Sequence, residues 1–163
     1  MKQYNNVMKG FTLVELLVVM AVMGILLSLS YVTLLGAQRR SSLNSTVSVL
    51  VTDIKQQQLK TMTGDTGGAT PSGSYGLYFQ PSRYTVFHGT QYQAGQASNY
   101  VVNLDPTVSF SSILFPNASL VFATVSGEVV NYASGSSSVI VKDTTSSEQK
   151  TIIVNQFGTI TIN

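Results

Sequence analysis

An uncharged and mostly apolar segment near the N-terminus constrains this chain more than any other feature. The segment covers residues 16–38 and directly follows Glu15. A run of at least about 18 apolar residues is typical of a transmembrane helix, whereas a secretory signal peptide has a shorter apolar region with its cleavage site behind it. Here a small residue, Gly10, lies before the run. A cut after Gly10 would remove residues 1–10 as a leader and leave the apolar segment on a mature chain that begins at Phe11.

Residues 9–15, Lys-Gly-Phe-Thr-Leu-Val-Glu, resemble the type III signal of the type IV pilin and pseudopilin superfamily. In that superfamily a membrane-bound prepilin peptidase cuts after the glycine and methylates the new N-terminal amine. The resemblance therefore implies cleavage between Gly10 and Phe11 and N-methylation of Phe11. It also implies that Glu15, the fifth mature residue, directs assembly with other pilin or pseudopilin subunits at an inner-membrane assembly platform.

Glu15 has two interpretations that the sequence leaves open. Thr12 and Glu15 have the spacing of a capping box, in which the glutamate only completes the start of a helix. A carboxylate near lipid is costly, about 2.5–3.5 kcal/mol at the bilayer centre, and is usually functional. The functional interpretation pairs Glu15 with the amine of Phe11, from its own chain or from a neighbouring one, and it is the one we favour.

One continuous helix is predicted over residues 11–62, because no proline interrupts them. Residues 11–37 form its transmembrane and assembly half, and residues 38–63 form an amphipathic half that Gly64 ends. The predicted apolar face consists of Leu43, Val47, Leu50, Ile54, Leu59 and Met62. Other faces carry the polar residues Arg40, Asn44, Asp53, Lys55, Gln57 and Lys60.

Two small residues in the apolar half, Gly24 and Ser28, are four residues apart. Such a pair permits close packing between helices in a membrane, and we list both as candidate packing residues. The alternative, that small residues simply occur in such helices, stays open.

The chain changes character after a Gly- and Thr-rich connector at residues 64–73. Runs rich in β-branched and aromatic residues, separated by Gly, Pro, Asn and Ser, predict antiparallel strands. They lie at 75–79, 84–88, 100–104, 108–110, 120–124, 128–132, 139–142, 151–154 and 159–162. We therefore expect an α+β, pilin-like fold, in which the long N-terminal helix packs on an antiparallel β-sheet domain at residues 74–163.

A second resemblance concerns the C-terminal strands. Leu120-Val121-Phe122, Gly127, residues 139–142, residues 151–154 and Gly158 are similar to the pattern of the GspH/FimT group of minor pilins and pseudopilins. The pattern covers about 45 residues and consists of strands and turn glycines.

Composition argues against several other classes of protein. Two of the nine basic residues, Lys2 and Lys9, lie in the leader, so seven basic side chains balance seven acidic ones in the mature chain. This balance argues against a basic surface for nucleic acid, and DNA binding is kept only as an alternative. The chain has no cysteine, and its single histidine, His88, has no ligand-type neighbours. Residues 64–68, Gly-Asp-Thr-Gly-Gly, only superficially resemble a serine-protease motif. We expect no catalytic, metal or cofactor site.

The sequence thus predicts a non-catalytic filament subunit. It would be a minor pilin or pseudopilin of a type IV pilus, a competence pilus or a type II secretion filament. Before assembly it would span the inner membrane once, with its C-terminal domain outside the cytoplasm, and afterwards it would belong to a periplasmic or surface filament. A DNA-binding minor pilin of natural transformation and an uncleaved, membrane-anchored β-domain adhesin are the alternatives.

Overall fold

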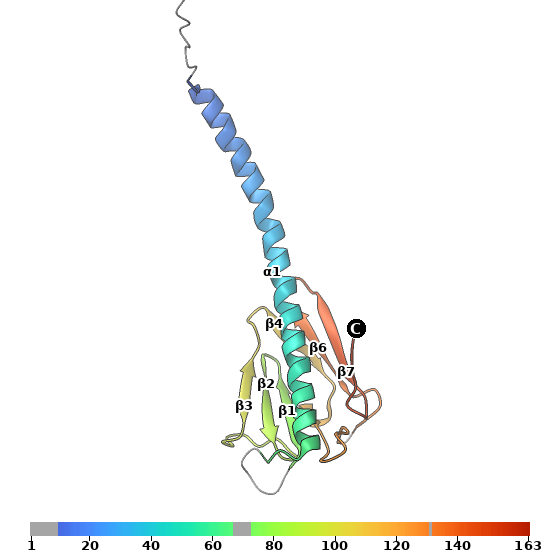
Figure 1. Cartoon of the computed structure of the whole chain (residues 1–163). Coiled ribbons are helices and arrows are strands. Elements are labelled where there is room, and N and C mark those ends of the chain that lie inside the picture. The colour runs from blue at the N-terminus through green and yellow to red at the C-terminus, as the bar shows by residue number, and fades with distance from the viewer. Residues whose placement is uncertain (1–9, 67–72, 131) are drawn as a thin grey trace, which may run out of the picture. The chain divides into compact units, whose positions relative to one another are not determined.

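The computed structural model describes residues 10–66, 73–130 and 132–163, without the side chains of residues 30–39. It contains one long helix, α1 (Leu13–Thr63, 51 residues), which confirms the predicted continuous helix (Figure 1). The chain forms two compact units, Met1–Gln38 and Arg39–Asn163. The described part of the first unit is the N-terminal half of α1 and the three residues before it, 10–12. Most of the connector predicted at 64–73, residues 67–72, lies outside the described residues.

The C-terminus of α1 is fixed by Gly64, as predicted. Gly64 has a φ of 67°, in the left-handed region where a glycine pays no steric penalty. Its N–H donates to the carbonyl oxygen of Thr61 at 3.4 Å, and the N–H of Asp65 donates to that of Lys60 at 3.0 Å. These two bonds form a Schellman motif, which satisfies carbonyl groups that the last turn of a helix otherwise leaves free.

The second unit adds two four-stranded antiparallel sheets to the C-terminal half of α1. The first sheet has the strand order β3-β2-β1-β5, with β1 (Tyr75–Gln80), β2 (Arg83–His88), β3 (Tyr100–Asn103) and β5 (Ser119–Val121). The second has the order β4-β6-β7-β8, with β4 (Val108–Ile113), β6 (Ser138–Asp143), β7 (Gln149–Val154) and β8 (Ile160–Ile162). A short 3-10 helix, η1 (Pro116–Ala118), precedes β5. The predicted α+β fold with antiparallel strands is confirmed.

The strand predictions differ from the structure around residues 120–132. No strand is assigned at 128–132 among the described residues there, and only an isolated bridge joins Phe122 to Val129. The cause is a tight turn: Val125 and Gly127 both have positive φ, and the N–H of Gly127 donates to the carbonyl oxygen of Ala123 at 2.9 Å. The strands of the predicted antiparallel domain divide between two sheets.

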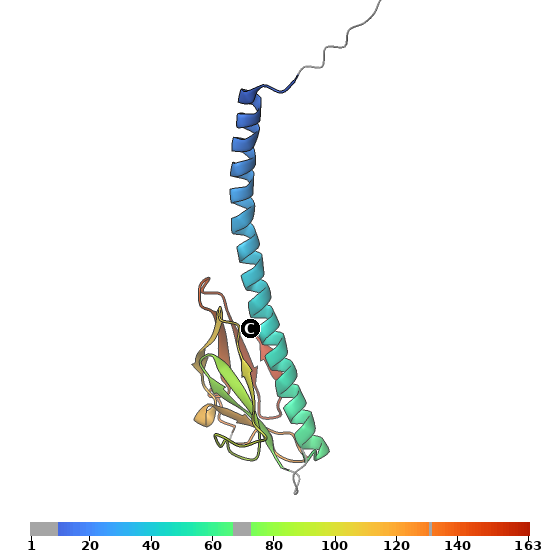
Figure 2. The same cartoon turned by 90° about the vertical axis from the view of Figure 1, so that its left-hand side faces the viewer.

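The hydrophobic core lies where α1 packs against both sheets. Figure 1 shows β1, β2 and β3 on one side of the helix axis and β6 and β7 on the other, and Figure 2 shows both sheets on one side of the helix. Leu50 and Ile54 of α1 are fully buried there. The same cluster contains Leu77, Phe79 and Tyr84 from the first sheet and Val108, Phe110, Val139, Val141, Ile152 and Val154 from the second.

The buried face of α1 differs from the prediction at its C-terminal end. Leu43, Val47, Leu50 and Ile54 are buried as predicted, but Leu59 and Met62 are 60% and 47% exposed. The polar residues Gln57 and Thr61 are buried instead, at 3% and 0% exposure. Alternating steps of four and three residues from Leu43 lead to 57 and 61, so helical geometry selected these positions over the more apolar neighbours.

Thr61 shows how one of these two buried polar positions is tolerated. Its hydroxyl donates to the carbonyl oxygen of Gln57 at 2.8 Å and accepts the N–H of Tyr75, at the start of β1, at 3.0 Å. A buried hydroxyl with both partners avoids the cost of an unpaired polar group and joins the helix to the first sheet.

A second polar contact between helix and sheet predicts how stability depends on pH. Tyr84 is 1% exposed, and its hydroxyl donates to the Asp53 carboxylate at 2.5 Å. Burial, followed by the hydrogen bond and the negative charge of Asp53, raises the pKa of Tyr84 far above its ordinary value. The folded state therefore favours the protonated phenol. This contribution is fully present below about pH 10, where an unfolded tyrosine ionises, and is lost as the pH rises above it.

We therefore expect Tyr84→Phe to reduce the alkaline loss of stability. Between about pH 10 and pH 11, Tyr84 alone should lower the free energy of unfolding of the parent by up to about 1.4 kcal/mol per pH unit. Urea unfolding of the full chain in detergent, followed by far-UV circular dichroism, measures this slope. Tyr132→Phe, which changes a more exposed ring (37%), is the matched control. A slope unchanged in Tyr84→Phe would contradict the prediction.

Candidate processing and assembly site

The predicted cleavage site lies just before α1. Gly10 is exposed, and a Cβ added to it would meet no atom within 4 Å. Phe11 follows with 83% of its surface exposed. Residues 1–9, the rest of the predicted leader, lie outside the described residues. Within the described part of the chain, no packed structure covers the bond between Gly10 and Phe11.

Thr12 begins the helix by capping it. The backbone N–H of Glu15 donates to the Thr12 hydroxyl at 3.2 Å, as expected for an N-cap residue and its N3 position. The Glu15 side chain is exposed, and its carboxylate forms no hydrogen bond or ion pair with any described residue. The cap therefore uses the backbone of Glu15 and leaves its negative charge unneutralised, near the N-terminus of the helix, where the helix dipole favours an anion.

The helix after Glu15 presents apolar side chains on all sides. All large apolar residues from Leu16 to Leu29 are between 49% and 69% exposed. They are Leu16, Leu17, Val18, Val19, Met20, Val22, Met23, Ile25, Leu26, Leu27 and Leu29. An apolar surface of this extent on a described helix marks a contact surface for something outside the monomer.

In the part of the chain that the structure describes, no helix is both long and apolar enough to cross a membrane. The predicted transmembrane half, 11–37, includes residues 30–37, whose side chains are outside that part.

Gly24 and Ser28 lie one above the other on the helix, as their spacing requires. A Cβ at Gly24 would meet no atom within 4 Å, and the Ser28 hydroxyl donates to the carbonyl oxygen of Ile25 at 2.8 Å. Neither residue is covered in the monomer. Their role in helix packing stays a prediction, which concerns contacts with other chains.

The residues considered for catalysis lie at the end of α1 and at the end of β2. Gly64 ends α1, and the protease-like segment 64–68 continues into residues outside the description. His88 lies at the end of β2 with its ring 4.8 Å from that of Tyr75. Among the described residues, no group of three His, Cys, Asp or Glu side chains could hold a metal ion.

The sequence analysis missed the contacts that anchor the C-terminal end of α1. The Gln58 amide donates to the carbonyl oxygens of Gly127 at 2.9 Å and Phe157 at 3.1 Å. A Cβ at Gly158 would lie 2.2 Å from that amide nitrogen, and one at Gly127 would lie 2.6 Å from Met62. Gly127 and Gly158 were the sequence signal for these contacts, because glycines in turns often mark places where another segment approaches the backbone closely.

Comparison with known proteins gives one match. Residues 5–31 match the model of the prokaryotic N-terminal methylation motif. The matched segment contains the predicted cleavage site and Glu15. The resemblance of the C-terminal strands to the GspH/FimT group lies outside the match and stays a prediction. Searches of curated proteins and of solved structures gave no match. The chain therefore carries a prepilin-type N-terminal methylation signal, the signal of type IV pilin-like subunits.

Proposed function

We propose that this protein is a non-catalytic filament subunit, a minor pilin or pseudopilin. The observation that carries the proposal is the exposed apolar helix at residues 16–29, which lies within the segment matched by the methylation motif, residues 5–31. Burial of a large apolar side chain contributes about 1.5–3 kcal/mol, so this helix gains most by leaving water. Lipid would cover it before assembly, and the helices of other subunits would cover it in the filament.

Cleavage would complete the assembly site. Removal of residues 1–10 by prepilin peptidase creates an amine on Phe11, which the peptidase then methylates, four residues from the Glu15 carboxylate. The described structure gives that carboxylate no partner of its own, so the new amine, from the same or a neighbouring chain, would be its counter-ion. Neutralising the charge lowers the cost of placing Glu15 among apolar helices.

The filament would grow by open-ended stacking of subunits. Contacts between unlike surfaces of successive copies produce such an assembly when the rotation does not close a ring. The helix would lie inside, with Gly24 and Ser28 allowing neighbouring helices to approach closely. The two-sheet unit would face outward, after translocation from the inner membrane. A type IV pilus, a competence pilus and a type II secretion filament all use subunits of this kind.

The N-terminus of the native protein tests the proposal. We expect intact mass spectrometry of the chain purified from its source to give a protein that lacks residues 1–10 and carries one methyl group. Fragmentation should place the methyl group on the amine of Phe11. A chain that retains residues 1–10 would contradict the proposal and favour an uncleaved, membrane-anchored protein.

A further inference from the structure

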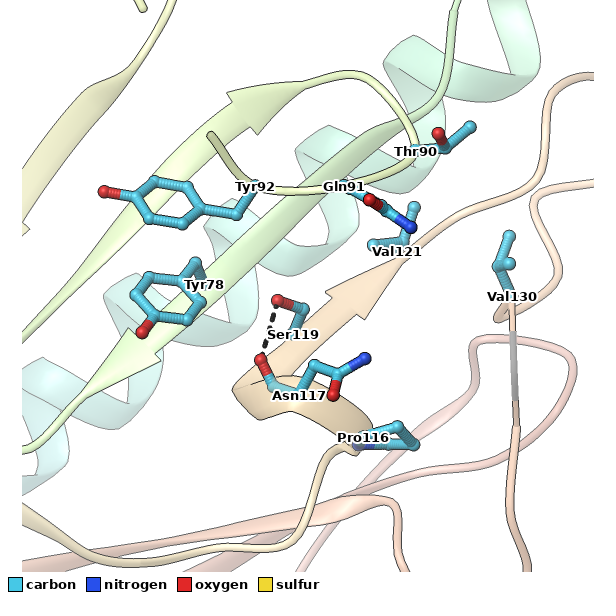
Figure 3. Close-up of a pocket in the computed structure, with 9 residues that line it drawn as sticks. All are labelled: Tyr78, Thr90, Gln91, Tyr92, Pro116, Asn117, Ser119, Val121 and Val130. Atoms are coloured by element: carbon cyan, nitrogen blue, oxygen red, sulfur yellow. Dashed lines mark hydrogen bonds between the residues drawn. The ribbon is translucent and has the colours of Figure 1, made fainter. Parts of the chain in front are cut away.

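A pocket of about 280 Å³ opens on the first sheet. It is formed by β1, the loop after β2, η1 with β5, and the segment at Val130 (Figure 3). The residues that line it are Tyr78, Thr90, Gln91, Tyr92, Pro116, Asn117, Ser119, Val121 and Val130. Its volume is just below the range for pockets that hold drug-sized ligands, about 300–1,000 Å³, so the pocket suits a small ligand.

Two stacked tyrosines hold one wall of the pocket in place. The rings of Tyr78 and Tyr92 are 4.1 Å apart and nearly parallel, at 5°. The Tyr92 ring also contacts Phe87 of β2 edge-on, at 5.7 Å. Aromatic contacts of this type contribute about 0.5–1.5 kcal/mol each beyond the burial of area. They fix the loop after β2 on the sheet and so position Gln91, the neighbour of Tyr92.

The opposite wall contains strained backbone. Asn117 and Ala118 have φ values of 53° and 52°, in the left-handed region. This conformation costs roughly 1–2 kcal/mol for a residue with a Cβ, although asparagine adopts it more readily than most. Such strain gathers at ligand-binding sites. Figure 3 shows the Asn117 and Gln91 carboxamides extending toward the space between the two walls.

The lining of the pocket combines uncharged polar groups with apolar groups. None of the described residues that form it is charged. Its polar groups are hydroxyls and carboxamides, which both donate and accept hydrogen bonds, and its apolar groups are Pro116, Val121 and Val130. A phosphate or sulfate would find no cation, and a cationic ligand would find no carboxylate. The lining suits an uncharged ligand with many hydroxyl groups and one apolar face, which is the chemistry of a pyranose ring.

An extended peptide fits this surface less well. A peptide usually adds to a sheet through the free backbone of an edge strand. Beside the pocket, the N–H of Val130 donates to the carbonyl oxygen of Val121 at 2.8 Å, and Phe122 pairs with Val129. The chain itself therefore already uses part of the outer edge of β5 and its continuation.

We propose that this pocket binds one or two sugar residues of a neutral glycan. The Gln91 and Asn117 carboxamides and the Ser119 and Thr90 hydroxyls would bond the ring hydroxyls. The apolar floor of the pocket would receive the C–H face of the ring. This function is separate from filament assembly and does not depend on cleavage of the leader.

An array of neutral, sialylated and sulfated oligosaccharides tests the proposal with the full chain in a polyoxyethylene detergent. Maltoside and glucoside detergents must be avoided, because their sugar headgroups would compete. We expect binding to neutral glycans that is insensitive to salt. Titration calorimetry on the best of them should show affinity reduced on the order of tenfold by Gln91→Ala and by Asn117→Gly. Glycine at 117 removes the carboxamide and tolerates the positive φ, so the turn is kept.

Gln56→Ala, which removes an exposed carboxamide on α1, is the matched control and should bind like the parent. Thermal unfolding of all variants confirms that they are folded. Three results would each overturn the proposal. They are no binding to any neutral glycan, binding that the two pocket variants do not weaken, and binding confined to anionic glycans and abolished by salt.

Discussion

Replacement of Gly10 by valine is expected to abolish maturation of this protein. The peptidase must accommodate the residue before the cut, and the signal supplies one without a side chain at this position. In the described structure a Cβ at Gly10 meets no atom within 4 Å, so a side chain at this position has room among the described residues. A loss of cleavage would therefore report on recognition by the peptidase. We expect immunoblots of cells with the native peptidase to show only the full-length precursor.

Gly24→Val is the matched control for this experiment. Gly24 is also exposed, with no atom within 4 Å of an added Cβ, but it lies far beyond the cut in the sequence. This variant should be cleaved as efficiently as the parent, although it could pack less well in a filament. If Gly10→Val also matures normally, the cleavage site has been assigned to the wrong bond.

The elements of this fold were predictable where a local signal specifies them. The absence of proline gave the continuous helix, and Gly64 gave its end through a left-handed backbone that other residues adopt at a cost. Strands of alternating burial such as β6, flanked by turn residues, were also recognisable. Each of these signals is carried by neighbours in sequence.

Features that depend on contacts between distant residues were not predictable. The order of apolar and polar residues could not show that Gln57 and Thr61 would be buried in place of Leu59 and Met62. The buried hydroxyl of Thr61 accepts a hydrogen bond from the N–H of Tyr75. Tyr75 reaches this position only once the sheet forms. The division of the strands into two sheets likewise rests on pairings that no single segment encodes.

The two candidate sites show the same contrast. The predicted processing site is a continuous motif, so Gly10, Phe11 and Glu15 could be proposed from the sequence alone, and all three lie within the matched segment. The pocket on the first sheet combines a tyrosine of β1, a loop after β2 and the turn before β5. These segments come together only in the folded chain, so no sequence motif could indicate the pocket.

The second large effect is expected from Glu15→Gln. Glutamine keeps the size of the side chain and its capacity for hydrogen bonds, but it removes the charge. The Thr12 cap accepts the backbone N–H of residue 15, so it is unaffected by this change. Cleavage after Gly10 should proceed normally. The amine of Phe11 would then lose its counter-ion in the packed helices, and breaking such a buried pair costs about 3–5 kcal/mol.

Incorporation of Glu15→Gln into filaments should therefore fall on the order of 100-fold or more. Quantitative immunoblotting of sheared filaments against total mature protein measures this ratio. Thr12→Ala is the complementary control: it removes the helix cap, at a cost of about 1 kcal/mol, and keeps the charge of Glu15. We expect Thr12→Ala to assemble nearly like the parent. The opposite result, with Glu15→Gln assembling normally and Thr12→Ala failing, would assign this segment to helix initiation and remove the case for a charge pair with Phe11.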